Sequence, residues 1–216
     1  RDYIEKDKLL TPDANGCTLL AFLLAYWPEI IVEGDLLHEQ GMLNPLLLDM
    51  DPEVVNSTVA VGPKAGLSVA FFLAKSEKGV ALLSRKNNRL ANGISEVTMS
   101  QAVVSGGWAG MSVAMLLALT PRGQSLLAAN HFLLTGRINQ WVLNHNVSSE
   151  RFRHLSVAWL FSMSSLGVGI LAADGRRLLN LITPVELNRA VPGKRFRDSS
   201  CAYGLAWHAP ELLTSA

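Results

Sequence analysis

The sequence predicts an all-α protein, a right-handed or curved α-solenoid (α/α superhelix) of 44-residue units with three helices each. The first observation is that three long segments resemble one another at a constant spacing of 44 residues. The second is that no segment shows the alternation of apolar and polar residues that is typical of a strand. The third is a composition of 49% hydrophobic and 17% charged residues, which is typical of an ordered globular chain. Because one short three-helix unit cannot cover its own apolar face, we expect the units to stack on one another.

The repeat is visible when the chain is compared with itself. The segment GLSVAFFLAKSEKGVALL at residues 66–83 recurs as GMSVAMLLALTPRGQSLL at 110–127 and as HLSVAWLFSMSSLGVGIL at 154–171. Looser copies begin near Thr18 and Ser200. We therefore predict a single helical-repeat domain over residues 1–216, with units at 16–65, 66–109, 110–153 and 154–197 and a truncated cap at 198–216.

The first helix of each unit is predicted to be short, covering about residues 67–75 in the second unit. It is almost wholly apolar, as expected for a helix that is buried on most sides. A serine stands at the start of each copy, and a serine at this place caps a helix or allows close packing between units. These serines are Ser68, Ser112, Ser156 and Ser200.

The second helix is predicted to begin after Ser76, Thr120 and Ser164 and to continue for about 14 residues, because apolar residues keep a helical spacing that far. Pro121 follows Thr120, and proline is favoured at the first helical position. An early glycine is expected to let the neighbouring helix approach closely. A third helix is predicted at about 94–103, 138–147 and 182–191. Helix should exceed about two thirds of the residues, without any β-sheet.

In its length and its short first helix, this unit resembles the armadillo and HEAT classes of helical repeat. The resemblance concerns the period and the number of helices over nearly the whole chain, and it implies an α-solenoid. Residues 110–114, Gly-Met-Ser-Val-Ala, followed by a leucine pair, are also similar to the opening of an ankyrin repeat. Because ankyrin repeats have a period of about 33 residues, only a distant ankyrin-like solenoid is implied by this second likeness.

Charge is distributed unevenly along the chain, although the formal net charge is only +1. Residues 1–65 hold 4 Lys/Arg against 11 Asp/Glu, residues 66–150 hold 7 against 3, and residues 151–216 hold 8 against 4. Only two cysteines occur, Cys17 and Cys201, so the sequence predicts reduced thiols rather than a disulfide framework. An intracellular, reducing location is favoured, with any targeting signal outside this fragment.

The uncharged stretch at residues 155–173 is long enough to span a bilayer. Four serines and two glycines dilute it, and the equivalent stretches of the earlier units carry Lys75, Glu77 and Arg122. Charged groups of this kind are costly in lipid, so we predict no membrane span.

Motifs that suggest catalysis or cofactor binding have structural explanations. Residues 167–172 fit a G-x-G-x-x-A pattern, but a dinucleotide site requires a preceding strand, and here the pattern lies within a helical repeat. The five histidines show no metal-ligand spacing, and no G-x-S-x-G elbow surrounds the repeated serines. We therefore predict no cofactor, no metal and no enzymatic activity.

The predicted function is that of a scaffold or adaptor that binds a protein partner through a solenoid groove. A small-molecule ligand is not expected. The first alternative is a nucleic-acid-binding solenoid, because basic residues gather late in the chain. The second is a helical accessory domain of a larger enzyme. The basic residues are Arg151, Arg153, Arg176, Arg177, Arg189, Lys194, Arg195 and Arg197.

The predicted contact residues lie where one unit departs from the repeat. Trp141 occupies the place that holds Val97 and Val185 in the flanking units, and it lies in a polar stretch. A tryptophan there either fills a gap in the core or anchors a partner in the groove. The candidate partner-binding residues are Asn139, Gln140, Trp141 and Asn144.

Overall fold

The computed structural model describes residues 8, 11–14, 17–26, 51–59, 62–104, 106–129, 133–192 and 198–214. Helices make up 62% of these residues, and among them there is no β-sheet. The all-α prediction is thus confirmed for the described part, although the helix content falls slightly below the expected two thirds. The chain divides into two compact units, residues 1–98 and 99–216, which are called the first unit and the second unit and are larger than the 44-residue units predicted from the sequence.

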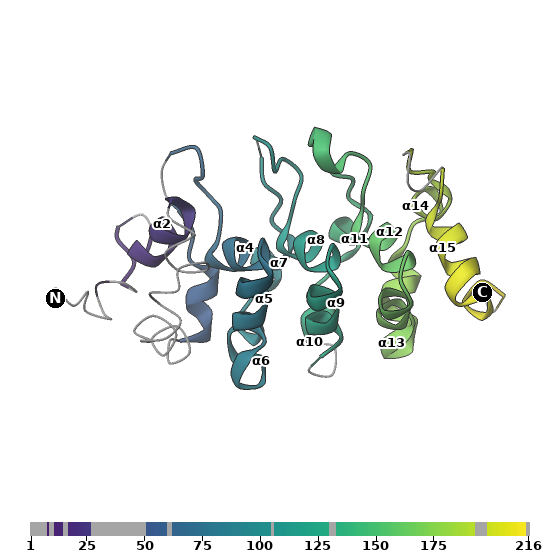
Figure 1. The fold of residues 1–216 in the computed structure, drawn as a ribbon, viewed down its shortest axis with the longest axis horizontal. Helices are drawn as coiled ribbons and strands as arrows, with labels where there is room; N and C mark the ends of the chain where they lie inside the picture. Colours follow the sequence, from purple (N-terminus) through teal and green to yellow (C-terminus); the bar gives the residue numbers. More distant parts are fainter. Residues whose placement is uncertain are drawn as a thin grey trace. The chain divides into compact units, whose positions relative to one another are not determined.

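One 3₁₀ helix and four α-helices lie wholly inside the described part of the first unit. The wholly buried α4 packs against α2, α5 and η3, which places it at the centre of this unit (Figure 1). A further short helix, α7 (Glu96–Ser100), spans the boundary at residue 98. The elements of the first unit are α2 (Leu19–Tyr26), η3 (Pro52–Asn56), α4 (Val69–Ala74), α5 (Glu77–Leu83) and α6 (Arg85–Asn92).

The second unit is built around three short apolar helices that pack in series. The α8 helix contacts α12, α12 contacts α15, and α9 and α13 lie beside α8 and α12 (Figure 1). The elements of this unit are α8 (Val113–Ala118), α9 (Pro121–Ala128), α10 (Leu133–Gly136), α11 (Gln140–Asn144), η5 (Glu150–Phe152), α12 (Val157–Ser162), α13 (Ser165–Leu181), α14 (Pro184–Asn188), α15 (Cys201–His208) and η6 (Pro210–Leu212).

The repeated serines cap the first helices, as predicted. The side chains of Ser68, Ser112, Ser156 and Ser200 each accept a hydrogen bond from the backbone N–H three residues later. Each bond satisfies a donor that would otherwise be unpaired at the helix start. The caps fix where α4, α8, α12 and α15 begin.

The early glycine of the second helix has the predicted packing role. A methyl group at Gly79, Gly123 or Gly167 would lie 2.1, 2.2 or 2.3 Å from the carbonyl oxygen of Leu73, Leu117 or Phe161. The caps predicted just before these glycines are also present, since Ser76, Thr120 and Ser164 each accept from the glycine N–H. The first and second helices are therefore in backbone contact.

The second helix is not one continuous helix of about 14 residues, as the sequence predicted. It is interrupted between α5 and α6 and between α9 and α10, and α13 contains non-helical residues from Ala173 to Arg176. Asn87, Asn88, Asp174 and Gly175 have φ values between 50° and 61°. Because glycine, asparagine and aspartate best tolerate this left-handed region, they distort α6 and interrupt α13, whereas the break between α5 and α6 lies at Ser84.

The third helix is also shorter than predicted. It covers only five residues in α7, α11 and α14, and Val103, Val147 and Val191 lie outside it. The backbone N–H groups of these three valines instead donate to the carbonyl oxygens of Met111, Leu155 and Ser199. These bonds pair two extended segments, so the chain has already left the helix at the valines, where the third helix was predicted to end.

The leucines that recur at a spacing of 44 residues in the sequence are buried. Leu83, Leu127 and Leu171 are each 0% exposed. Burial of these apolar side chains supplies most of the driving force for folding. In the described part of the chain, no helix has the length and apolar character needed to cross a membrane, and residues 155–173 are divided between α12 and α13.

Candidate functional site

Trp141 lies on the outer side of α11. Asn139 caps this helix by accepting a hydrogen bond from the N–H of Val142 at 3.0 Å, and Val142 and Leu143 point into the core at 2% and 0% exposure. This orientation leaves Gln140 and Trp141 exposed, and the exposed fraction of Trp141 is 53%. Trp141 therefore does not fill a gap in the core, which was one of the two interpretations of its place in the repeat.

The indole ring of Trp141 is held against the imidazole ring of His145. The ring centroids are 4.4 Å apart and the planes differ by 26°, which is a stacked geometry. Partial burial lowers the pKa of His145 from its ordinary value, so the imidazole is uncharged at neutral pH. The stack restricts the tryptophan while leaving about half of its surface open.

Asn144 holds two segments of the second unit together. Its amide nitrogen donates to the carbonyl oxygens of Gln140 and Leu181, at 2.7 and 2.9 Å. Its amide oxygen accepts from the backbone N–H of Thr183 at 2.9 Å. Asn144 thus connects α11 to the segment at residues 181–183.

The same bridge occurs 88 residues earlier, in the first unit. Asn56 donates to the carbonyl oxygen of Gly93 at 2.8 Å and accepts from the N–H of Ser95 at 2.8 Å. Ser100 stands 44 residues after Asn56 and 44 residues before Asn144. Its hydroxyl accepts a hydrogen bond from the side-chain amide of Asn139 at 3.4 Å. The amides of Asn139 and Asn144 therefore have structural partners, and among the four predicted residues Gln140 and Trp141 are the ones whose side chains are exposed.

A shallow hollow of about 610 Å³ surrounds the Trp141 ring. No acidic or basic residue lines this hollow apart from His145, whose lowered pKa keeps it neutral at neutral pH. We call this surface the Trp141 hollow. It is lined by Gln140, Trp141, Asn144, His145, Asn146 and Thr183.

A second hollow, of about 820 Å³, lies between the loops at residues 106–109 and 148–152. Trp108 and Phe152 stack in it with ring centroids 5.7 Å apart. The hydroxyl of Ser149 is buried at this site and has no hydrogen-bond partner. The sequence contained a signal for this site, because Trp108 and Phe152 stand 44 residues apart, but the loops were predicted only as links.

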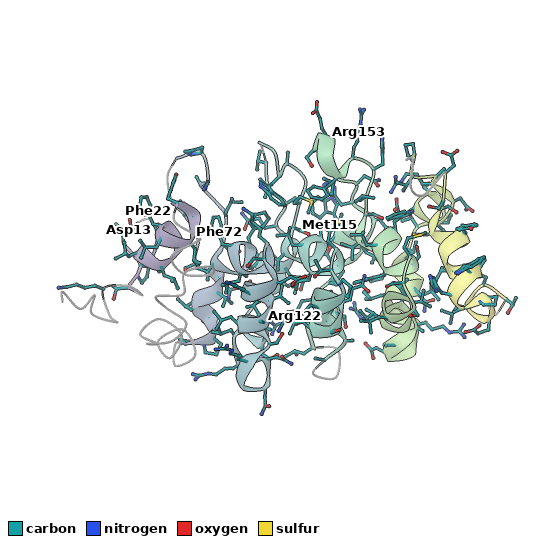
Figure 2. The ribbon with its side chains drawn as sticks, in the orientation of Figure 1. Asp13, Phe22, Phe72, Met115, Arg122 and Arg153 are labelled. Atoms are coloured by element: carbon teal, nitrogen blue, oxygen red, sulfur yellow. The ribbon has the colours of Figure 1, made fainter. Side chains whose placement is uncertain are left out.

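Several of the late basic residues have partners within the second unit. Arg177 donates to the carbonyl oxygens of Thr135 and Ile138, and Arg189 forms a two-point ion pair with Glu186. Arg153 is exposed at the loop that follows η5 (Figure 2). Of the eight basic residues that favoured the nucleic-acid alternative, four have side chains outside the described part of the chain: Arg151, Lys194, Arg195 and Arg197.

Groups that resemble catalytic or metal-binding residues are held in structural positions. Burial raises the pKa of the Cys201 thiol to about 12, so this thiol is protonated at neutral pH and a poor nucleophile. Gly167 and Gly169 lie inside α13 rather than after a strand. No cluster of three His, Cys, Asp or Glu residues suited to a metal ion occurs among the described residues.

The lowered pKa of His145 predicts a pH dependence of stability. Between the folded pKa and the unfolded value of about 6.5, the unfolded state binds more protons, so the free energy of unfolding decreases as the pH falls through this range. The variant His145→Phe keeps a stacked ring that cannot be protonated. In urea titrations at pH 7.5 and 5.0, we expect the parent to lose more stability than this variant. Equal losses would contradict a lowered pKa of His145 in the folded protein, since the other four histidines are common to both proteins.

Comparisons of the chain with protein-family models, with curated proteins and with solved structures give no match.

Proposed function

We propose that the chain is an α-solenoid of 44-residue units and that it works as a protein-binding scaffold, with Trp141 as a principal anchor for the partner. Solenoids offer extended surfaces suited to macromolecules. The proposal joins two kinds of support: structural features that return every 44 residues, and an exposed aromatic residue at a place where the units differ.

The recurring features support the repeat. Besides the capping serines, the residue two places before each of them has a left-handed backbone: φ is 82° at Gly66, 83° at Gly110, 70° at His154 and 56° at Asp198. Glycine, aspartate and histidine are among the residues that adopt a left-handed conformation most readily, so the return of this conformation at a spacing of 44 residues supports a common loop shape. We propose that each unit consists of a loop of paired extended segments, a capped helix pair and a short third helix.

This unit order favours the ankyrin-like alternative over the armadillo and HEAT likeness. Ankyrin units combine a turn-containing loop with two helices, whereas armadillo and HEAT units consist of helices throughout. The loops at 103–111 and 147–155 are each closed by two backbone hydrogen bonds. Val103 donates to Met111 and accepts from Gly110. Val147 donates to Leu155 and accepts from His154. In the proposed solenoid, the third helices and the residues that directly follow them supply the binding surface, because the Trp141 hollow is lined by α11 and residues 145–146.

The exposure of Trp141 is the observation that carries the proposed function. Val97 and Val185, at the same place in the flanking units, are 74% and 78% exposed, so the fold leaves this place open in each unit. Only the middle unit fills it with a large ring, and that ring is braced by His145. Large, restrained aromatic side chains are the residues that most often dominate binding energy at protein interfaces.

The lining of the Trp141 hollow favours a protein partner over nucleic acid. Binding to phosphates depends on Lys and Arg side chains, and none lines this hollow. Two of the late arginines, Arg177 and Arg189, also have internal bonds. We propose that the partner presents an uncharged segment, with apolar groups against the indole and polar groups within reach of Gln140 and Asn146.

The test compares proteins captured by three immobilised forms of the chain: the parent, Trp141→Ala and Val185→Ala. The valine variant is a matched control, because it truncates an exposed apolar residue at the equivalent place. We expect quantitative mass spectrometry to show at least one protein that depends on Trp141 and is retained by Val185→Ala. A set of captured proteins that is identical for all three forms would contradict the proposal.

The nucleic-acid alternative is tested by filter binding of RNA and DNA at two salt concentrations. A protein that neutralises several phosphates loses affinity steeply as salt rises. We expect weak binding that Trp141→Ala does not change. Tight, strongly salt-dependent binding that requires Arg153 would favour the alternative instead.

A further inference from the structure

Three side chains of the Trp141 hollow offer hydrogen-bond donors to a partner. In the described part of the chain, the indole N–H of Trp141 and the side-chain amides of Gln140 and Asn146 take part in no hydrogen bond. All three residues are exposed, whereas Asn144 and Thr183 are bonded to each other. An indole is only a donor, and a primary amide has two donor hydrogens for one acceptor oxygen. Donor hydrogens therefore outnumber acceptor oxygens among the groups that a partner can reach.

The lining of the hollow does not suit three common ways of binding a peptide segment. A bound helix needs a row of apolar pockets, but the lining contains one large apolar side chain, Trp141. An added strand needs an exposed sheet edge, and the described residues form no β-sheet. A phosphorylated or acidic segment needs a cluster of arginines, and no arginine lines the hollow. The recurring mode that fits an uncharged surface around one aromatic ring is the docking of a polyproline II segment.

A polyproline II segment has the hydrogen-bonding groups that the hollow lacks. This conformation makes no internal hydrogen bonds, so its carbonyl oxygens stay available as acceptors. Proline has no backbone N–H, so a proline-rich segment brings more acceptors than donors. His145 stacks on one face of the indole while 53% of the Trp141 side chain stays exposed, which leaves room for a proline ring to pack against it.

The shallowness of the hollow also favours a segment that is ordered before it binds. A shallow surface buries little of its partner, so a flexible chain would lose much of the gain in conformational entropy. From these observations we infer that the Trp141 hollow binds a proline-rich segment in the polyproline II conformation. A proline ring lies on the indole, and carbonyl oxygens of the segment accept from Trp141, Gln140 and Asn146. The inference rests on the proposed protein-binding function and names the chemical class of the partner.

The test follows the indole N–H signals of the full chain by NMR during titration with decaproline. The chain has five tryptophans, and the Trp141 signal is the one that is missing from the spectrum of Trp141→Phe. We expect this signal to move with decaproline and to stay in place with a glycine–serine peptide of the same length, which is uncharged and flexible. Titration to about 5 mM detects dissociation constants in the millimolar range.

Two variants separate the hydrogen bonds from the general exposure of this surface. Gln140→Ala removes a donor and leaves the ring in place, so decaproline should bind about three- to tenfold more weakly. Val185→Ala, which truncates the residue at the place equivalent to Trp141, should bind decaproline as the parent does. Circular dichroism melts establish that each variant is folded.

The inference would be overturned by a Trp141 signal that does not move with decaproline, by equal movement with the glycine–serine peptide, or by unchanged binding to Gln140→Ala. The proposed function is judged separately. A protein captured through Trp141 whose binding segment contains no proline would overturn this inference and leave the proposed function intact. Capture that does not depend on Trp141 would overturn both.

Discussion

Replacing Gly167 with alanine is expected to lower the free energy of unfolding by about 3 kcal/mol or more. The added methyl group would lie 2.3 Å from the carbonyl oxygen of Phe161 and 2.5 Å from its Cα. These are backbone atoms, so no side-chain rotation relieves the overlap, and α12 and α13 must move apart. Urea titration followed by circular dichroism measures the change.

Gly169→Ala is a matched control in the same helix. A methyl group at Gly169 has no neighbour within 4 Å, and alanine is the better helix former. We expect this variant to be as stable as the parent or more stable by up to about 1 kcal/mol. Similar losses at both glycines would mean that the close approach of α12 does not decide the effect, which would contradict the packing described for the second helix.

Replacing Glu186 with glutamine is expected to cost about 3 kcal/mol, because it leaves the charge of Arg189, whose side chain is only 20% exposed, without a counter-ion. Glu186 is 3% exposed, and its two carboxylate oxygens accept from Nε and Nη2 of Arg189, both at 2.8 Å. The hydroxyl of Ser156, which caps α12, also donates to this carboxylate. The loss therefore affects the junction of α14 with α12.

Asp174→Asn is the control for this ion pair. Asp174 also pairs with an arginine three residues later, but the side chain of Asp174 is 66% exposed and the Arg177 Nε to Asp174 Oδ2 distance is 3.6 Å. Exposed pairs contribute about 0 to 1 kcal/mol, and we expect a loss in that range. A loss at Glu186 no larger than the loss at Asp174, measured by the same urea titration, would show that Arg189 finds water or another partner when the carboxylate is removed.

The sequence predicted the parts of the fold that depend on local chemistry. The capping residues and close-approach glycines were identified because a cap and a glycine each have a local physical reason that repetition makes visible. The lengths of the second and third helices were wrong. The backbone of Asn87 is left-handed within α6, and Val103 is held outside the helix by its bonds to Met111 and Gly110. Asparagine and valine also occur inside helices, so these interruptions cannot be read from a single sequence.

The candidate site was predicted in part. Comparing the 44-residue units identified Trp141, since a departure from the repeat is visible in the amino-acid sequence alone. The stacking on His145 depends on where the chain turns after α11. The structural role of Asn144 depends on Leu181 and Thr183, which are 37 and 39 residues away, and no local sequence pattern predicts such a bridge.

The most direct test of the proposed function is the affinity of Trp141→Ala for a partner protein captured by the parent. Isothermal titration calorimetry should show binding weakened by about 2 kcal/mol or more, which is about 30-fold, because the variant removes an exposed anchor. Since Trp141 is 53% exposed, the midpoint of thermal unfolding should stay close to that of the parent. An unchanged affinity, with the variant folded, would contradict the proposal that Trp141 anchors a protein partner.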